Sequence, residues 1–141
     1  MNSLWKLTFV LVAWTIVVPG IASNADSTAK VSISGRVIGS SGTRTVYVML
    51  WDSTGFIKNP VRQLRLRPDA EKSFSFSVAP GRWAVSSFED RNENGLLDMG
   101  FFGPKEPSGF WRPFHEKRKP RFDDVASQID RAISNADVKL H

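Results

Sequence analysis

The chain has 141 residues, no cysteine and a formal net charge of +5. Apart from an N-terminal targeting segment, this length suffices for one domain with its own core and is too short for two. Without cysteine there is no disulfide framework, so the domain has to be stabilised by packing, or by packing together with a bound ion.

The N-terminus has the pattern of a cleaved secretory signal peptide. Lys6 is the only charge before an apolar run from Leu7 to Val18, and Pro19-Gly20 and small residues follow. The run is shorter than the roughly 20 apolar residues that a membrane-spanning helix needs. Residues 1–25 are therefore predicted to be a signal peptide. Residues 30–141 are predicted to be a single exported domain, periplasmic or extracellular, without a transmembrane segment.

Alternation of apolar and polar residues then predicts a series of short strands. They are expected at residues 31–37, 45–51, 61–67, 73–78 and 82–88. The second, TVYVMLW, is apolar on both faces and should be central, whereas the third is weaker. Turn signals such as Pro80-Gly81 separate the strands. Short strands with frequent turns predict an all-β fold, an antiparallel β-sandwich.

The stretch DRNENGLLD, residues 90–98, carries the most specific chemistry in the chain. Its spacing matches the first, third, fifth, seventh and ninth positions of an EF-hand calcium loop, and Gly95 permits a sharp turn. The oxygen ligands would be Asp90, Asn92, Asn94, the carbonyl of Leu96, and Asp98. The twelfth position, a bidentate Glu in an EF-hand, is Phe101, so the loop is half of that signature.

Two interpretations of this loop stay open. Asn, Asp and Gly also make tight surface turns, because they tolerate left-handed backbone angles and cap their own amides. The regular spacing favours a Ca²⁺ site of modest affinity, since the loop has only two carboxylates and sites in extracellular modules have dissociation constants of about 10⁻⁴–10⁻³ M. A further ligand has to come from elsewhere, with Glu106 as the first candidate and Asp123, Asp124 and Glu89 as the others.

After Met99 the chain is irregular and rich in aromatic residues. These rings either fold back to close one end of the core, which is the commoner use of aromatic residues, or form a lip that faces a ligand. In the second case Phe110, Trp111 and Phe114, together with Phe101, would stack on sugar faces. The domain would then be a carbohydrate- or small-ligand-binding module.

Two basic segments suggest surfaces for a partner. Residues 112–121 (RPFHEKRKPR) form either a solvated loop or a patch for an anionic envelope surface or polysaccharide. Nucleic acid is not an expected partner, because an exported protein seldom meets it. The strand with Arg62, Arg65 and Arg67 could be an exposed sheet edge, although charged edges usually prevent pairing.

The C-terminal part of the chain is ambiguous. Apolar residues from Val125 to Ala136 keep helical spacing behind Asp124, which could cap a helix. Residues 125–129 and 135–140 also have the pattern of two strands, and the alternation at the end of the chain favours a strand there.

No catalytic constellation is recognisable. His115 and His141 are the only histidines, and neither stands in the spacing of a catalytic triad or a zinc site. A hydrolase that uses Asp98 and Glu106 as paired carboxylates is conceivable. Structural carboxylates in a calcium loop explain these residues better, so the chain is not expected to be an enzyme.

Several of these segments resemble one group of bacterial exported proteins. VAPGRWAVSSFEDRNENGLLD, residues 78–98, is similar to the pattern PPGRYAVAVFHDENGNGKLD of the domain of unknown function family 2141. GPKEPSGF, residues 103–110, resembles its GIPKEPYGF segment, and RFDDVA, residues 121–126, resembles its FEDA stretch. The residues around Leu50-Trp51-Asp52 and Gly55-Phe56 are similar to its second strand and the turn that follows.

The resemblance implies a transthyretin-like or prealbumin-like sandwich with strands in the C-terminal part, and no assigned biochemical role. Two positions depart from the pattern. Glu89 replaces a His, and Trp111-Arg112-Pro113 replaces a Ser-Asn-Asn that often follows the Gly-Phe pair. The expected function is a non-catalytic exported envelope domain with a Ca²⁺-organised loop at 90–98, and the alternative is the carbohydrate- or small-ligand-binding module.

Overall fold

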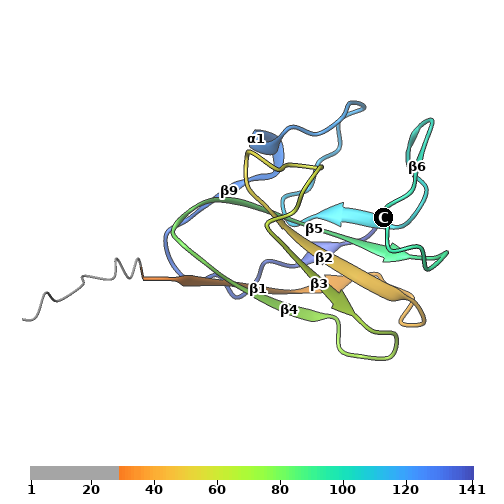
Figure 1. The fold of residues 1–141 in the computed structure, drawn as a ribbon, viewed down its shortest axis with the longest axis horizontal. Coiled ribbons are helices and arrows are strands. Elements are labelled where there is room, and N and C mark those ends of the chain that lie inside the picture. The colour runs from red at the N-terminus through yellow and green to blue at the C-terminus, as the bar shows by residue number, and fades with distance from the viewer. Residues whose placement is uncertain (1–28) are drawn as a thin grey trace, which may run out of the picture.

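Two packed β-sheets and a small hairpin make up residues 29–141, the part of the chain that the computed structural model describes (Figure 1). The first sheet has the strand order β10-β1-β4. In it, β1 (Val31–Ile38) pairs antiparallel with β4 (Ser73–Val78) and parallel with β10 (Val138–Lys139). The predicted signal peptide, residues 1–25, lies outside the described residues and stays a prediction.

The second sheet has five strands in the order β3-β2-β5-β8, with β9 paired to the beginning of β5. These strands are β2 (Thr45–Trp51), β3 (Arg62–Leu66), β5 (Gly81–Asp90), β8 (Ser108–Phe110) and β9 (Ser127–Ile129). As its sequence predicts, β2 is central, and β3 with its arginines is an edge strand. A separate hairpin of β6 (Met99–Gly100) and β7 (Gly103–Pro104) lies within the segment predicted to be irregular.

The main core lies between the two sheets. Alternate residues of β2 and β4 supply much of it, because successive side chains of a strand point to opposite faces. The buried residues from these two strands are Val46, Val48, Leu50, Phe74, Phe76 and Val78. The predicted all-β class with antiparallel sheets is confirmed, and two packed layers are compatible with the predicted sandwich.

The other face of the second sheet is also covered. Trp51 and Phe88 point to this side and pack with Val125 at the end of the short helix α1 (Phe122–Val125). In Figure 1, α1 and the chain leading to it lie over the sheet on the side away from β1 and β4. The Trp51 indole N–H donates to Ser86 Oγ at 2.8 Å, so the buried ring has its hydrogen-bond partner. This second cover explains why β2 is apolar on both faces.

The first and last strands of the described chain are neighbours in the first sheet. Val37 in β1 is opposite Val138 in β10. Gly35 permits the close approach, because a Cβ at this position would lie 2.4 Å from the carbonyl carbon of Ala136. The sequence predicts antiparallel sheets. In this sheet, β1 pairs in parallel with the C-terminal segment, and its pairing with β4 is antiparallel.

The C-terminal part forms strands at 127–129 and 138–139, as the resemblance implied. The helical alternative for Val125 to Ala136 is not realised, since the one helix of the described residues ends at Val125. The reason is tertiary: β9 pairs with β5 and the last residues pair with β1, and such pairing overrides a weak local helical pattern.

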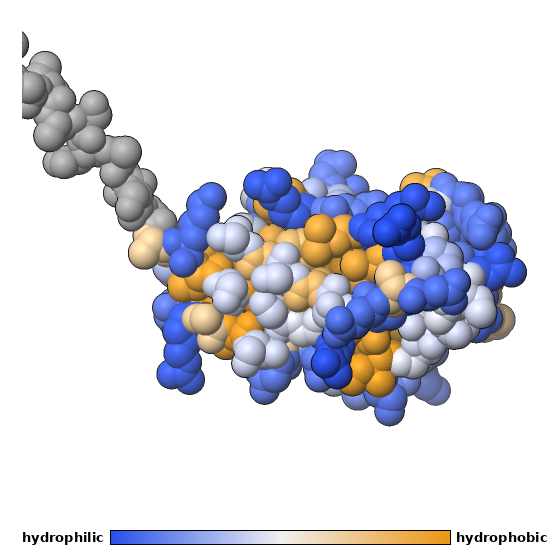
Figure 2. Space-filling model, turned by 90° about the horizontal axis from the view of Figure 1, so that it is seen from below, coloured by the Kyte–Doolittle hydropathy of each residue, from blue (hydrophilic) through white to orange (hydrophobic). Residues whose placement is uncertain are grey.

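Hydrophobic residues are partly visible at the surface. In Figure 2, which shows the molecule from below, they lie between hydrophilic side chains that occupy the margins of that face. A domain of this size has too little polar surface to hide all its apolar atoms, so this mixture is ordinary. Among residues 29–141, no helix has the length and apolar character needed to cross a bilayer.

Asp124 fixes the segment that covers the second sheet. Its carboxylate accepts two hydrogen bonds from the Arg118 guanidinium, at 2.7 and 2.9 Å, and one from the Arg121 backbone N–H at 2.7 Å. Arg118 also pairs with Glu116 at 2.6 Å and lies over the Phe114 ring. These bonds hold the pKa of Asp124 well below its usual range; the bonds from Arg118 contribute most, and the bond from Arg121 contributes next.

Asp124→Asn should therefore lower the Tm at neutral pH by weakening these bonds. Because the pKa of Asp124 is lower in the folded state than the unfolded value of about 3.9, its contribution is present above about pH 4 and is lost as the pH falls below that. The Tm difference between the wild type and the variant should shrink accordingly when thermal unfolding is followed from pH 7 down to about pH 2.

Asp123→Asn in the same helix is the matched control. Asp123 also pairs with an arginine, Arg82, at 2.6 Å, but its side chain is 77% exposed, and exposed pairs contribute little. Its variant should leave the Tm nearly unchanged. A Tm difference for Asp124→Asn that stays constant from neutral to acid pH would contradict the role given to this carboxylate.

Candidate functional site at the end of strand β5

The candidate site lies where β5 ends and the chain turns towards the β6–β7 hairpin. The last two residues of β5, Glu89 and Asp90, are 2% and 1% exposed. A buried carboxylate is costly unless hydrogen-bond donors or charges compensate it. Since neighbouring side chains of a strand point in opposite directions, the two carboxylates have to find their donors in different loops.

Asp90 organises the loop that follows it. Its Oδ1 accepts from the Asn94 backbone N–H at 3.2 Å, and its Oδ2 accepts from the Gly95 backbone N–H at 2.8 Å. Gly95 has a φ of 75°, a left-handed conformation that glycine adopts without strain. The loop is thus a tight turn capped by the first of its predicted ligands, as one of the two sequence interpretations expects.

Asp98 is the point on which the two asparagines converge. The Asn94 side-chain amide donates to both Asp98 oxygens, at 3.2 and 3.1 Å, and the Asn92 side-chain amide donates to Oδ2. The third, fifth and ninth positions of the loop therefore meet in space. The asparagines present their nitrogens to Asp98, and a half-turn of each carboxamide would bring its oxygen to the same place.

Glu106 joins the two ends of the loop. It lies between β7 and β8, is 6% exposed, and accepts from the backbone N–H groups of Arg91 at 2.8 Å and Asp98 at 3.2 Å. Each of its oxygens thus has a backbone donor. The sequence predicts Glu106 as an additional metal ligand, and in the structure it holds the beginning and the end of the loop together.

Most of the predicted ligands belong to one hydrogen-bonded group, which links Asp90, Asn92, Asn94, Asp98 and Glu106. Leu96 joins it through its backbone N–H, which donates to Asn94 Oδ1 at 2.8 Å, while its side chain is exposed. Across residues 29–141, no three Asp, Glu, His or Cys side chains form a cluster that could hold a metal ion. A cation at this site would therefore need amide and carbonyl oxygens as well as carboxylates.

The other candidate ligands lie elsewhere. Asp123 and Asp124 belong to α1 and pair with Arg82 and Arg118. Glu89 accepts a hydrogen bond from the Ser41 backbone N–H at 2.5 Å, in the turn between β1 and β2. These three carboxylates are therefore engaged in other contacts.

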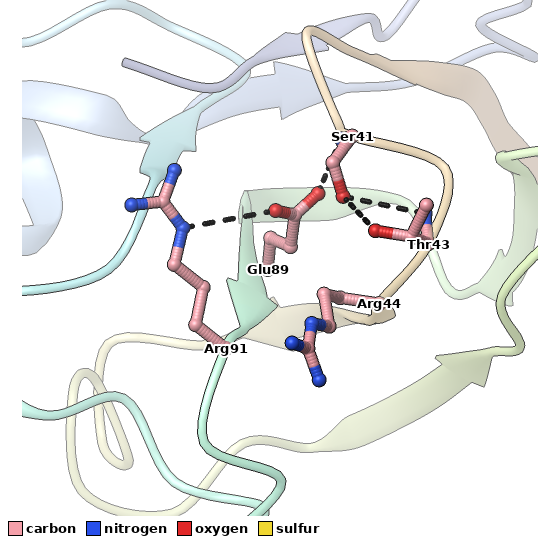
Figure 3. A pocket seen from close by; sticks show the side chains of 5 residues that line it. All are labelled: Ser41, Thr43, Arg44, Glu89 and Arg91. Atoms are coloured by element: carbon pink, nitrogen blue, oxygen red, sulfur yellow. Dashed lines mark hydrogen bonds and ion pairs between the residues drawn. The ribbon is translucent and has the colours of Figure 1, made fainter.

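Glu89 forms the floor of a small polar cavity (Figure 3). The cavity has a volume of about 250 Å³ and is lined by Ser41, Thr43, Arg44, Glu89 and Arg91. In Figure 3 the Arg91 side chain approaches Glu89, and the Arg44 guanidinium points away from it. The Arg91–Glu89 pair measures 3.9 Å, and Arg44 pairs with Glu93 at 3.4 Å. Ser41 and Glu89 are 48 residues apart, so no local sequence signal could have predicted this contact.

The aromatic residues proposed as ligand-binding are half-buried and serve packing. Phe110 and Phe114 belong to the cluster on the outer face of the second sheet, and Phe110 lies 6.1 Å from Phe56 between ring centroids. Trp111 packs against the core between the sheets. The rings therefore fold back onto the protein, and the sugar-binding alternative stays a prediction. Phe101 is different, since it is fully exposed.

The basic segment 112–121 is partly used within the fold. Arg112 donates to the Ala126 carbonyl at 2.7 Å, and Arg118 pairs with Asp124. These two side chains position the segment on the second sheet. The patch available to an anionic partner is accordingly smaller than the sequence suggests.

The fold and the loop together define a small all-β domain with a carboxylate-rich turn at the end of its longest strand. Residues 39–136 match the family described as "Uncharacterized protein conserved in bacteria (DUF2141)". Because the match covers more than half of the chain, the protein belongs to this family, which confirms the resemblance seen in the sequence. Neither a curated protein nor a solved structure matches the chain.

Glu106→Ala should destabilise the domain by about 2–4 kcal/mol, because two backbone N–H groups lose their charged acceptor in a largely buried place. Glu106→Gln keeps one acceptor oxygen and should cost less. Urea unfolding measures both effects, and hydrogen exchange of the Arg91 and Asp98 amides should accelerate in Glu106→Ala.

Glu71→Ala is the control, since this exposed glutamate has only a surface ion pair with Arg36 at 3.6 Å. It should change stability by less than about 0.5 kcal/mol. If Glu106→Ala unfolded at the same urea concentration as the wild type, with unchanged amide exchange, Glu106 would not be what closes the loop.

Proposed function

We propose that the protein is a non-catalytic domain of the bacterial envelope whose loop 90–98 binds Ca²⁺. The observation that carries the proposal is the convergence of Asn92 and Asn94 on Asp98, with Asp90 anchoring the loop from the end of β5. Carboxylate, amide and backbone oxygens are the ligands that Ca²⁺ prefers, and these residues have the spacing of the first half of an EF-hand loop.

The charge of the loop supports the proposal. Asp90, Asp98 and Glu106 belong to one hydrogen-bonded group, and among the described residues none of the three forms an ion pair with a lysine or arginine. Their donors are backbone N–H groups and asparagine amides. A divalent cation would neutralise charge that no basic side chain of the domain neutralises.

Binding would require a small rearrangement. The two asparagine carboxamides would turn so that their oxygens, with Asp98, face the ion, and the Leu96 carbonyl would complete the set. Glu106 would stay in place, because both its oxygens hold the ends of the loop. With few carboxylates left for the ion, the affinity should be modest, with a dissociation constant of about 10⁻⁴–10⁻³ M.

The cellular part of the proposal rests on the N-terminal sequence pattern and on membership of a family conserved in bacteria. The non-catalytic part rests on the scarcity of catalytic groups. The chain has no cysteine, and its two histidines, His115 and His141, lie against each other with ring centroids 6.5 Å apart. Structural carboxylates that bind an ion need no further catalytic partner.

Calcium should raise the Tm of the protein, and EDTA should reverse the rise. With a dissociation constant in the stated range, 5 mM Ca²⁺ should stabilise the folded state by roughly 1–2 kcal/mol, which corresponds to several degrees in Tm. Mg²⁺ should act more weakly, because it demands octahedral geometry and keeps its water. Thermal unfolding with each ion measures the effect.

Asp98→Asn should abolish the calcium response, because Asp98 is where the ligands meet. Asp90→Ala is less informative, since Asp90 is buried and caps the turn without any ion. Glu93→Gln is the matched control: it removes one charge from the same loop at a position that supplies no ligand, so it should keep the response. A wild-type melting curve that does not move in 5 mM calcium would refute the proposed site.

A further inference from the structure

The β6–β7 hairpin carries phenylalanines where a tight turn normally has small polar residues. Gly100 and Gly103 are paired in the hairpin, so Phe101 and Phe102 are its two turn residues. Such turns usually contain Asn, Asp or Gly. In this hairpin the glycines, Gly100 and Gly103, stand on either side of the turn instead of in it, and Gly103 has a φ of 133°. A local rule broken at one place is a sign of function.

Both rings stand in solvent. Phe101 and Phe102 are 96% and 97% exposed, and they contact each other edge to face at 5.0 Å between centroids. Met99, in β6 of the same hairpin, and Leu96, three residues before it in the chain, are also exposed. Aromatic side chains mostly serve burial, so two rings held outside the protein mark a contact with something else.

The base of the hairpin is held on the domain by the buried Glu106, which accepts from the backbone N–H groups of Asp98 and Arg91. The two arms of the hairpin are joined by one further bond. The Lys105 backbone N–H, just after β7, donates to the Asp98 carbonyl at 2.8 Å. The Lys105 side chain passes close to Gly100, since a Cβ on that glycine would lie 3.2 Å from Lys105 Cγ. A cationic side chain thus lies beside the apolar tip.

We propose that this hairpin tip, Phe101-Phe102, inserts into the surface of a lipid bilayer. An apolar tip that protrudes from the protein needs a partner that can surround it. In a lipid bilayer, the boundary between headgroups and acyl chains can surround such a tip without a preformed pocket. Lys105 lies beside the tip and the chain has a net charge of +5, and both favour a surface with anionic headgroups, although the loop 90–98 at the base of the hairpin is acidic. The inference does not depend on calcium in the loop 90–98.

A protein partner fits the tip less well. Two aromatic rings offer about 300–500 Å², below the roughly 800 Å² per partner of a stable interface. In the described part of the chain, neither of two surface hollows would give a second copy an apolar pocket for the tip. One is the polar cavity at Glu89. The other is lined by charged and small residues together with one aromatic residue, Phe74, which is itself only 6% exposed.

Vesicle co-sedimentation of the full chain tests the proposal, in EDTA so that the result is independent of the calcium site. The vesicles contain phosphatidylethanolamine and phosphatidylglycerol, with phosphatidylcholine vesicles for comparison. Phe101→Ser/Phe102→Ser should keep the wild-type Tm and reduce the partition coefficient on anionic vesicles by more than about tenfold. Val61→Ser, which removes an exposed apolar side chain outside the hairpin, should bind like the wild type.

A fluorescence experiment locates the contact. Because the chain has no cysteine, a single Cys can carry an environment-sensitive label. A label at Phe102→Cys should shift to the blue and brighten when anionic vesicles are added, and a label at Val61→Cys should not change. The N-terminal segment is the same in every variant, so a difference between them reports the tip.

Three results would overturn the proposal. The double serine variant could bind vesicles as well as the wild type, or the label at position 102 could stay unchanged in their presence. The third is self-association by analytical ultracentrifugation that requires both phenylalanines, without vesicle binding. The hairpin would then be a contact between copies of the chain.

Discussion

A carboxylate buried at the end of a strand has to find hydrogen-bond donors, and this requirement shapes the chain beyond β5. Asp90 finds its donors in the backbone of the next turn, which fixes the path of residues 91–95. Glu106 does the same for the two ends of the loop. Because backbone groups serve as donors, no arginine or lysine has to approach, and negative charge collects in one place. The β6–β7 hairpin follows directly after this negatively charged loop, residues 90–98.

Much of the fold could be predicted because its strands carry a two-residue period. SFSFSV in β4 has every phenylalanine inside and every serine outside, and the doubly apolar β2 is central because both faces of its sheet are covered. The β6–β7 hairpin could not be predicted, since phenylalanines occupy its turn positions. The parallel pairing of β1 with β10 could not be predicted either, because it depends on contacts between opposite ends of the chain.

The candidate site was predictable where its chemistry is local. The spacing from Asp90 to Asp98 predicts a shared metal site, which stays a prediction. In the structure Asn92 and Asn94 donate to Asp98, because a nine-residue loop confines these side chains. Glu106 was predicted near the loop, but its role as an acceptor for two backbone amides depends on where β7 and β8 return. Phe110 and Trp111 were ambiguous in sequence, since a ring for packing and a ring for a ligand are the same residue. Only their burial distinguishes them from Phe101.

The neighbouring positions of β1 and β10 have a consequence for the order of events in folding. The Arg36 backbone N–H donates to Asp137 across 101 residues of sequence, so the first sheet is incomplete until residues 137–139 have been made. Topologies with such distant contacts fold slowly, because a long loop must close before the contacts stabilise it. A chain of this kind remains unfolded for longer after synthesis.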